Sequence, residues 1–263
     1  MNKKIIIIGN TARLCGVEVD MNGFKEFFLS DCGGCWDDEE IVLYKNKNGV
    51  EILEMRDYYR RQNLDYAITI FTGHGAYDRN STILELQDND MINEDDLDLR
   101  AKKQLFIFDC CRAHLNVGIT ASAKSFSMIK NAQYPSSYEI REAYEERISR
   151  AFPQKVRLYA CSIGESAYDS GNGAFYSQSL LEFSDKLALY DERKFVLVAE
   201  AHSFAESKTY REVQRQHGDR QTPEIECEES IPPQNQLIIA VNPNIRCSQS
   251  SFLSSLRRSK IKR

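Results

Sequence analysis

Short apolar runs alternate along the chain with longer segments in which apolar residues recur at helical spacing. Continuous hydrophobicity that is rich in Ile, Phe and Val is typical of strands buried on both faces of a sheet. The runs therefore predict a mostly parallel sheet covered by helices. They lie at residues 4–8, 41–44, 67–71, 104–108, 156–160 and 237–241.

The segments between these runs predict the covering helices. In residues 20–29, helical spacing places Phe24, Phe27 and Phe28 on one face. The alternation of strand and helix predicts an α/β domain, an open doubly wound sheet of about six strands with helices on both sides. Further helices are expected at residues 50–62, 138–149, 174–183 and 195–210.

Three segments depart from this regularity and set the expected domain organisation. Residues 115–154 form a long connection between two core strands, and residues 212–236, with three prolines, predict a surface loop. The tail is serine-rich and ends in RRSKIKR. We expect one domain over residues 1–247 and a basic, disordered tail over residues 248–263.

Composition narrows the class of protein. The chain has 263 residues with 42% hydrophobic and 28% charged residues, an ordinary balance for a globular protein. A net charge of -5 argues against nucleic acid as a partner. No apolar stretch reaches the roughly 18 residues of a membrane span. The run of four isoleucines near the start is shorter than a signal core, so we expect a cytoplasmic protein.

The cysteines and acidic residues form no strong metal or redox motif. The eight cysteines are too scattered for a disulfide scaffold, and the single CxxC, Cys32 to Cys35, is interpreted as a glycine-rich loop with reduced thiols. Acidic residues crowd residues 88–98 without the spacing of a calcium loop, and Asn93 is typical of a helix cap. We therefore predict no metal or cofactor, and a calcium requirement has no clear motif behind it.

Distinctive polar residues follow two of the predicted strands. Residues 67–71 continue into TGHG, which contains His74, and residues 104–108 continue into DCCRA, which contains Cys111. Parallel strands end at one rim of a sheet, so the imidazole and the thiol are expected side by side. An imidazole can take the thiol proton and later protonate a leaving amine. The backbone amides of Gly75 and Cys111 are candidate oxyanion donors.

These motifs resemble those of caspases, metacaspases and their bacterial relatives over about residues 3–241. Either register of the family motif places the nucleophile at Cys111, with His74 as general acid and base. The spacing of 37 residues between them is shorter than the roughly 50 of caspases, and Ala113 replaces the family glycine. These departures favour a metacaspase-like or prokaryotic member. The resemblance implies a caspase-like three-layer sandwich, with residues 237–241 as the sixth strand, and a cysteine endopeptidase acting on proteins or peptides.

The resemblance also implies a substrate preference. Residues 165–169, ESAYD, are similar to the metacaspase segment whose aspartate binds Arg or Lys, which points to Asp169. Asp20 stands where metacaspases carry a second pocket carboxylate, although it could instead cap a helix. Two carboxylates favour a cationic side chain. Arg13 supports the competing hypothesis, a caspase-like preference for acidic residues.

Activation and two alternatives remain open at this point. The connection at residues 115–154 sits where caspase-like zymogens are cut, so self-processing is an expectation. The alternatives are a catalytically silent caspase-like interaction module and a small-molecule-binding doubly wound domain, and the second lacks a GxGxxG or P-loop motif. Monomer and dimer are equally compatible with the sequence. The candidate basic cleavage sites are Lys124, Lys130, Arg141, Arg147 and Arg150.

Overall fold

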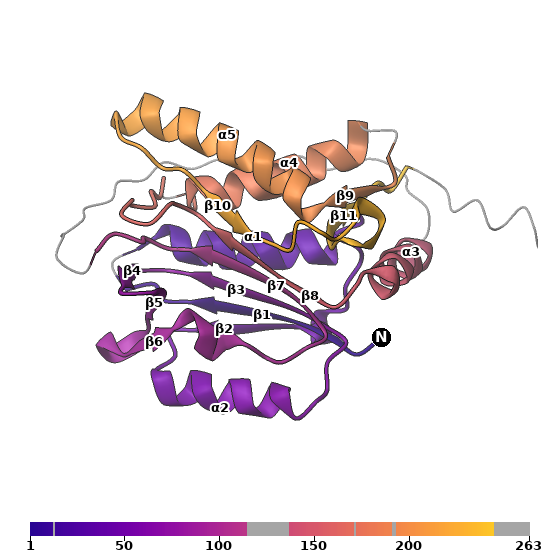
Figure 1. The fold of residues 1–263 in the computed structure, drawn as a ribbon, viewed down its shortest axis with the longest axis horizontal. Coiled ribbons are helices and arrows are strands. Elements are labelled where there is room, and N and C mark those ends of the chain that lie inside the picture. The colour runs from indigo at the N-terminus through magenta and orange to yellow at the C-terminus, as the bar shows by residue number, and fades with distance from the viewer. Residues whose placement is uncertain (13, 115–136, 171, 191–192, 245–263) are drawn as a thin grey trace, which may run out of the picture.

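A six-stranded sheet forms the centre of the molecule (Figure 1). The computed structural model describes the whole chain except residues 13, 115–136, 171, 191–192 and 245–263. The strand order is β10-β8-β7-β3-β1-β2, and every neighbouring pair is parallel except β10 with β8. The strands are β1 (Lys3–Gly9), β2 (Ile41–Lys45), β3 (Tyr66–Thr72), β7 (Lys103–Asp109), β8 (Gln154–Tyr159) and β10 (Glu224–Glu226).

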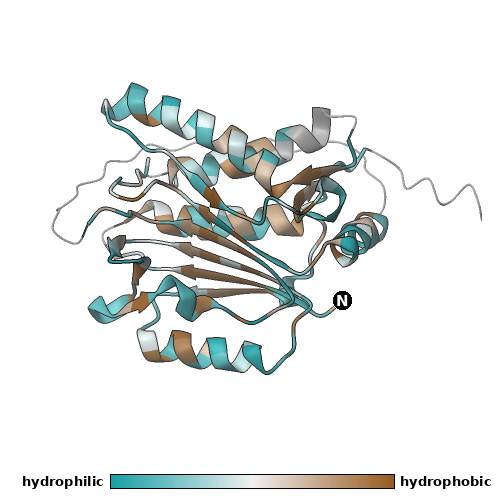
Figure 2. Cartoon of the chain, viewed as in Figure 1, coloured by the Kyte–Doolittle hydropathy of each residue, from teal (hydrophilic) through white to brown (hydrophobic). Residues whose placement is uncertain are grey.

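Two hydrophobic cores lie on opposite faces of this sheet. Successive side chains of a strand point to opposite faces, so Ile5 and Ile7 of β1 enter one core whereas Ile6 and Ile8 enter the other. The same alternation along β3 and β7 explains why the sequence shows continuous apolar runs. In Figure 2 the central strands are mostly hydrophobic along their length, while the helices carry both hydrophobic and polar residues.

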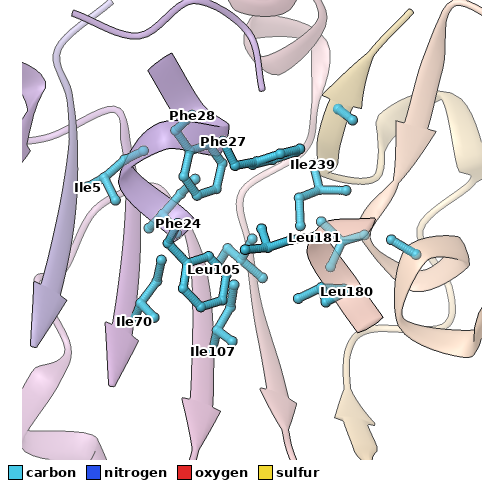
Figure 3. Close-up of a cluster of buried hydrophobic side chains, with 14 of the residues drawn as sticks. Ile5, Phe24, Phe27, Phe28, Ile70, Leu105, Ile107, Leu180, Leu181 and Ile239 are labelled. Carbon is cyan, nitrogen blue, oxygen red and sulfur yellow. The ribbon is translucent and has the colours of Figure 1, made fainter. Parts of the chain in front are cut away.

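Helices cover both faces and complete three layers (Figure 1). On one side lie α1 (Gly16–Leu29), α4 (Phe175–Tyr190) and α5 (Val198–His217), and α3 (Ser137–Arg150) packs into the same core. On the other side lies α2 (Gly49–Arg60). Figure 3 shows Phe24 of α1 among Ile70, Leu105 and Ile107 of the strands.

Two smaller sheets and four single-turn helices complete the described part of the fold. A three-stranded sheet contains β4 (Gly75–Asp78), β5 (Ser81–Glu85) and β6 (Met91–Asn93), and β9 (Phe195–Leu197) pairs with β11 (Ile238–Val241). The cap predicted at Asn93 is present, because its side chain accepts a hydrogen bond from the Asp95 amide. The single turns are η1 (Asp38–Glu40), η2 (Gln87–Asn89), η3 (Glu94–Leu97) and η4 (Pro233–Asn235).

The α/β fold with a mostly parallel six-stranded sheet is confirmed, but its sixth strand was assigned wrongly. Residues 237–241 do not join the central sheet, since β11 pairs only with β9 among the described residues. The edge position belongs to β10, which lies within the segment that was expected to be a loop. Its sequence, Glu-Ile-Glu, carries charges that pair with Arg112 and Arg157, so hydrophobicity alone does not reveal it.

Four helix boundaries also differ from the prediction by more than two residues, and two of them are the ends of α4 and α5, at Tyr190 and His217 rather than at residues 183 and 210. The helix expected at residues 195–210 begins only at Val198, after a short strand. The first helix starts at Gly16 rather than near residue 20, which rules out Asp20 as its N-terminal cap. Residue 15 supplies no capping side chain, and the Gly16 amide donates instead to Asp169 from a distant segment. The sequence around residue 16 alone therefore could not predict where α1 begins.

Candidate active site

The segments that carry His74 and Cys111 run alongside each other beyond the ends of β3 and β7. The last paired residues of these strands are Thr72 and Asp109, and the Gly73 amide donates to the Asp109 carbonyl at 3.2 Å. Farther along, the Tyr77 amide donates to the Ala113 carbonyl at 3.0 Å. His74 therefore lies between two contacts that bind its segment to the one containing Cys111.

Gly75 brings the two segments into close backbone contact. A Cβ atom built on Gly75 would lie 2.7 Å from the Cys110 Sγ atom and 3.0 Å from the Cys111 carbonyl oxygen. No side chain fits there without displacing the Cys110–Cys111 backbone. The glycine after His74 is thus required by the closeness of the two loops, and it places the backbones of Gly75 and Cys111 together.

The His74 imidazole is oriented by a backbone carbonyl. Its Nε2 atom lies 3.0 Å from the Ala12 carbonyl oxygen, in the loop that follows β1. A carbonyl only accepts hydrogen bonds, so Nε2 carries the proton and Nδ1 is the acceptor nitrogen of the neutral ring. The ring is therefore held in the tautomer in which Nδ1 can receive a proton.

The Cys111 thiol is covered by the loop after β8. Cys111 is 8% exposed, its Sγ atom accepts a hydrogen bond from the Ala167 amide at 3.3 Å, and it lies 3.6 Å from the Ala167 carbonyl oxygen. Burial raises the pKa of the Cys111 thiol, the Ala167 amide lowers it, and the negative charge of Asp109 raises it. The resting thiol is thus protonated, with one amide already directed at its sulfur.

Three carboxyl groups lie within this loop or next to it. Asp20 of α1 accepts hydrogen bonds from the Thr72 hydroxyl at 3.2 Å and from the Ala174 amide at 3.0 Å. Asp109, at the end of β7, accepts from the amide and hydroxyl of Ser177. Asp169 accepts from the Gly16 amide at 3.0 Å. We call Asp20, Asp109 and Asp169 the acidic cluster.

The electrostatics of the acidic cluster are dominated by burial and mutual repulsion. Burial, followed by the charge of Asp109, raises the pKa of Asp20 well above its usual value. Burial raises the pKa of Asp109 to about 6 against the hydrogen bonds from Ser177, and the charge of Asp169 adds to the rise. The strongest charge effects on Asp20 thus come from other carboxylates, a setting that favours the arrival of a cation.

Glycines make room for this cluster. A Cβ atom on Gly173 would lie 2.2 Å from an oxygen of Asp20, and a Cβ atom on Gly16 would lie 2.2 Å from both oxygens of Asp169. Gly173 also has a φ of 107°, a conformation that favours glycine. A larger residue at either position would therefore displace the Asp20 or Asp169 carboxylate.

Some site residues could not be read from the sequence. The resemblance predicted Asp20 and Asp169, whereas Asp109, although visible as part of DCCRA, was given no role because its neighbours are remote along the chain. Ala12 and Ala167 act through backbone atoms and leave no sequence signal. Arg13, the basis of the competing hypothesis, lies outside the described residues.

Within the part of the chain that the structure describes, no group of three or more His, Cys, Asp or Glu side chains is arranged to hold a metal ion. In the same residues no helix is both long and apolar enough to cross a membrane. Cys35 of the CxxC donates a hydrogen bond to Asp31, and burial raises the pKa of its thiol to about 12. That thiol is therefore unreactive near neutral pH.

Comparisons with known proteins agree with this architecture. The model of the caspase domain family, peptidase family C14, matches residues 2–231. No curated protein sequence matches the chain significantly.

Among solved structures, caspase-1 from Spodoptera frugiperda aligns with a TM-score of 0.56 and 14% identity over 94% of this chain and 91% of that one. The Drosophila initiator caspase Dronc aligns with a TM-score of 0.53 and 14% identity over 93% and 85% of the two chains. A protein from Geobacter sulfurreducens aligns with a TM-score of 0.51 and 12% identity over 92% and 99%. At these identities the likeness shows the fold alone.

The family match covers most of the chain and the fold is that of the caspases. The chain belongs to the caspase domain family of cysteine peptidases, as its motifs predicted. It is a caspase-like peptidase domain.

The acidic cluster makes stability depend on pH in a direction opposite to that of an ordinary ion-paired carboxylate. The folded state retains the Asp109 proton up to about pH 6, whereas the unfolded chain releases it near 3.8. The unfolding free energy of the wild type should therefore fall, relative to that of Asp109→Asn, as pH rises between these values. Urea unfolding of both chains across this range measures the effect.

An exposed carboxyl supplies the control, because Asp78→Asn should show no such divergence from the wild type. A constant stability difference between wild type and Asp109→Asn would show that Asp109 ionises as it does in water.

Proposed function

We propose that the protein is a cysteine endopeptidase that cleaves after Arg or Lys through a Cys111–His74 dyad. The observation that carries the proposal is the junction of the two loops, where Gly75 packs directly on Cys110 and Cys111 while Ala12 fixes the tautomer of His74. The family supplies the class of reaction, and these residues supply the chemistry.

The proposed steps follow from the protonation states. Nδ1 of His74 accepts the Cys111 proton, and the thiolate attacks the scissile carbonyl carbon. The amides of Gly75 and Cys111 donate hydrogen bonds to the developing oxyanion. The imidazolium then protonates the leaving amine, and water, deprotonated by the same ring, hydrolyses the thioester. Because burial raises the pKa of the Cys111 thiol, the thiol keeps its proton at rest. In this proposal its transfer to His74 occurs when the substrate is bound.

The acidic cluster supports a preference for a basic side chain next to the scissile bond. Asp169 is two residues from Ala167, whose backbone touches the thiol, and Asp109 is two residues from Cys111 itself. A guanidinium or ammonium group placed here would relieve the repulsion among the carboxylates. In this proposal Asp169 and Asp20 are specificity residues, and the structure adds Asp109.

One observation favours the alternative of a catalytically silent module. The Ala167 backbone covers the Cys111 sulfur, so a substrate must displace or slide past this loop. Labelling of Cys111 by an electrophilic basic peptide separates the two hypotheses, because a silent module would stay unlabelled.

The dyad is tested by single substitutions. We expect Cys111→Ala to abolish cleavage of a fluorogenic Arg peptide, and His74→Ala to lower kcat/KM by at least about 100-fold, the usual contribution of a general base. The measurement is steady-state hydrolysis with purified chains. Cys227→Ala is the matched control, since Cys227 is an exposed thiol and should retain wild-type activity.

Substrate preference is tested by substituting two aspartates that each accept a hydrogen bond from the first amide of a helix. Asp169→Asn should lower kcat/KM for Arg and Lys peptides by about 10-fold or more, the loss expected for one charged hydrogen bond. Asp90→Asn is the matched control, because Asp90 accepts a hydrogen bond from the Gly49 amide at the start of α2 as Asp169 does at α1.

The control should retain wild-type rates on the same peptides. A wild-type preference for Asp over Arg at the scissile bond would instead favour the acidic-substrate hypothesis.

Self-processing stays a prediction, with fewer candidate sites. Arg141, Arg147 and Arg150 lie on α3, and a helix does not offer the extended backbone that a peptidase cleaves. Lys124 and Lys130 lie outside the described residues. If processing occurs, fragments should end at one of these lysines in intact-mass spectra, and Cys111→Ala should remain whole. Fragmentation of Cys111→Ala at the wild-type rate would assign the cut to another protease.

A further inference from the structure

A fully buried glutamine lies behind the loop that touches the nucleophile. Gln221 is 0% exposed and sits between α5 and β10. Its Nε2 atom donates to the Ala160 carbonyl at the end of β8 at 2.8 Å, and its Oε1 atom accepts from the Tyr168 amide at 3.0 Å. Both hydrogen-bonding ends of the side chain are therefore used to join the loop to the central sheet.

The second hydrogen bond fixes the peptide group that faces the thiol. The Ala167 carbonyl and the Tyr168 amide belong to one planar trans peptide and point in opposite directions. Because the Tyr168 amide points at Gln221, the Ala167 carbonyl points at the Cys111 sulfur, which lies 3.6 Å away. The Ala167 amide, which donates to the same sulfur, belongs to the preceding peptide and is joined to this one through the Ala167 Cα atom, so releasing the Tyr168 amide frees it to move.

The residues around Gln221 hold the same loop at further points. Thr222 donates its amide to Glu165 at 2.6 Å, and Arg220 forms an ion pair with Glu165 at 3.0 Å. The Tyr168 hydroxyl donates to Asp219, and the Tyr168 ring stacks on His217 at 4.6 Å between ring centroids. The segment from His217 to Thr222 thus supports the loop that covers Cys111.

We propose that Gln221 is a positioning residue for the nucleophile: it anchors the Tyr168 amide, and thereby the Ala167 Cα atom, so that the neighbouring Ala167 amide stays directed at the Cys111 sulfur. This inference rests on the proposed role of Cys111. The amide donates to the thiolate more strongly than to the thiol, so its position favours the ionised sulfur. No chemistry at Gln221 itself is required.

Apart from the imidazolium that the proposed mechanism forms at His74, the charges around the sulfur do not supply this stabilisation. The negative charge of Asp109 raises the pKa of the Cys111 thiol, and Cys110, Cys161 and Tyr168 are the other ionisable groups coupled to it by charge. His74 follows the neighbouring strand, and Arg112 directs its guanidinium to Glu224. Among the described contacts of the sulfur, the Ala167 amide is the one that lowers its pKa.

The test is the pH profile of Cys111 alkylation by iodoacetamide, with the modified peptide quantified by mass spectrometry. In Gln221→Met the side chain keeps its length but loses both hydrogen bonds. The midpoint of the profile should move upward by about one pH unit relative to the wild type, since a hydrogen bond to the charged form is misdirected. A change in accessibility alone would alter the rate and leave the midpoint in place.

Gln104→Met is the matched control. Gln104 is also buried, donates to Asp98 at 2.8 Å and accepts from the Leu99 amide at 3.1 Å, near the start of β7 and far along that strand from Cys111. Its substitution removes the same number of hydrogen bonds and should leave the midpoint unchanged. An equal shift in both variants, or no shift in Gln221→Met, would overturn the proposal.

If Gln221→Met does not fold, Gln221→Asn carries the test, because it keeps the amide group but is too short to join the Ala160 carbonyl and the Tyr168 amide at once. It should move the midpoint in the same direction by a smaller amount, and an unmoved midpoint would refute the proposal. Alkylation needs no peptidase activity. A wild type that cleaves no peptide would therefore count against the proposed function and leave this profile as a separate result.

Discussion

The chemistry of this domain depends on the register between β3 and β7. Seven residue pairs, from Tyr66 with Lys103 to Thr72 with Asp109, align the two strands so that their following loops meet. A slip of one residue would turn every side chain to the opposite face. Both faces are buried, with Ile68 and Leu105 in one core and Phe71 and Phe108 in the other, so such a slip is strongly disfavoured. Core packing therefore decides where the imidazole and the thiol stand.

The same burial creates the electrostatic character of the site. A thiol and carboxyl groups at the end of a buried sheet lose water, so the pKa values of Cys111, Asp20 and Asp109 all rise. Hydrogen bonds from Ala174 and Ser177 offset part of this cost for the carboxylates without neutralising their charge. In the proposed function a positive group relieves this repulsion and an acidic side chain adds to it, so the cluster would discriminate between basic and acidic side chains.

The sequence predicted the parts of this arrangement that are periodic or that carry distinctive side chains. The apolar runs located five of the six central strands, and the polar residues after two of them identified His74 and Cys111. It could not predict β10, because an edge strand is half solvated and its glutamates hide it from a hydrophobicity pattern. The role of Ala167 could not be predicted for another reason. It contacts the thiol through backbone atoms, which any residue possesses.

Residues 165–169 connect the Cys111 thiol to the acidic cluster within five positions. Ala167 contacts the thiol through its backbone, and Asp169, two residues later, joins the acidic cluster and the start of α1. A cation that draws the Asp169 carboxylate away from the Gly16 amide must strain the short backbone that joins Asp169 to Ala167. Gln221 restrains that strain, since it holds the intervening peptide against the end of β8. If the proposed function holds, a basic side chain arriving in the cluster acts on the sulfur through these two residues, and substrate preference and activation of Cys111 depend on one loop.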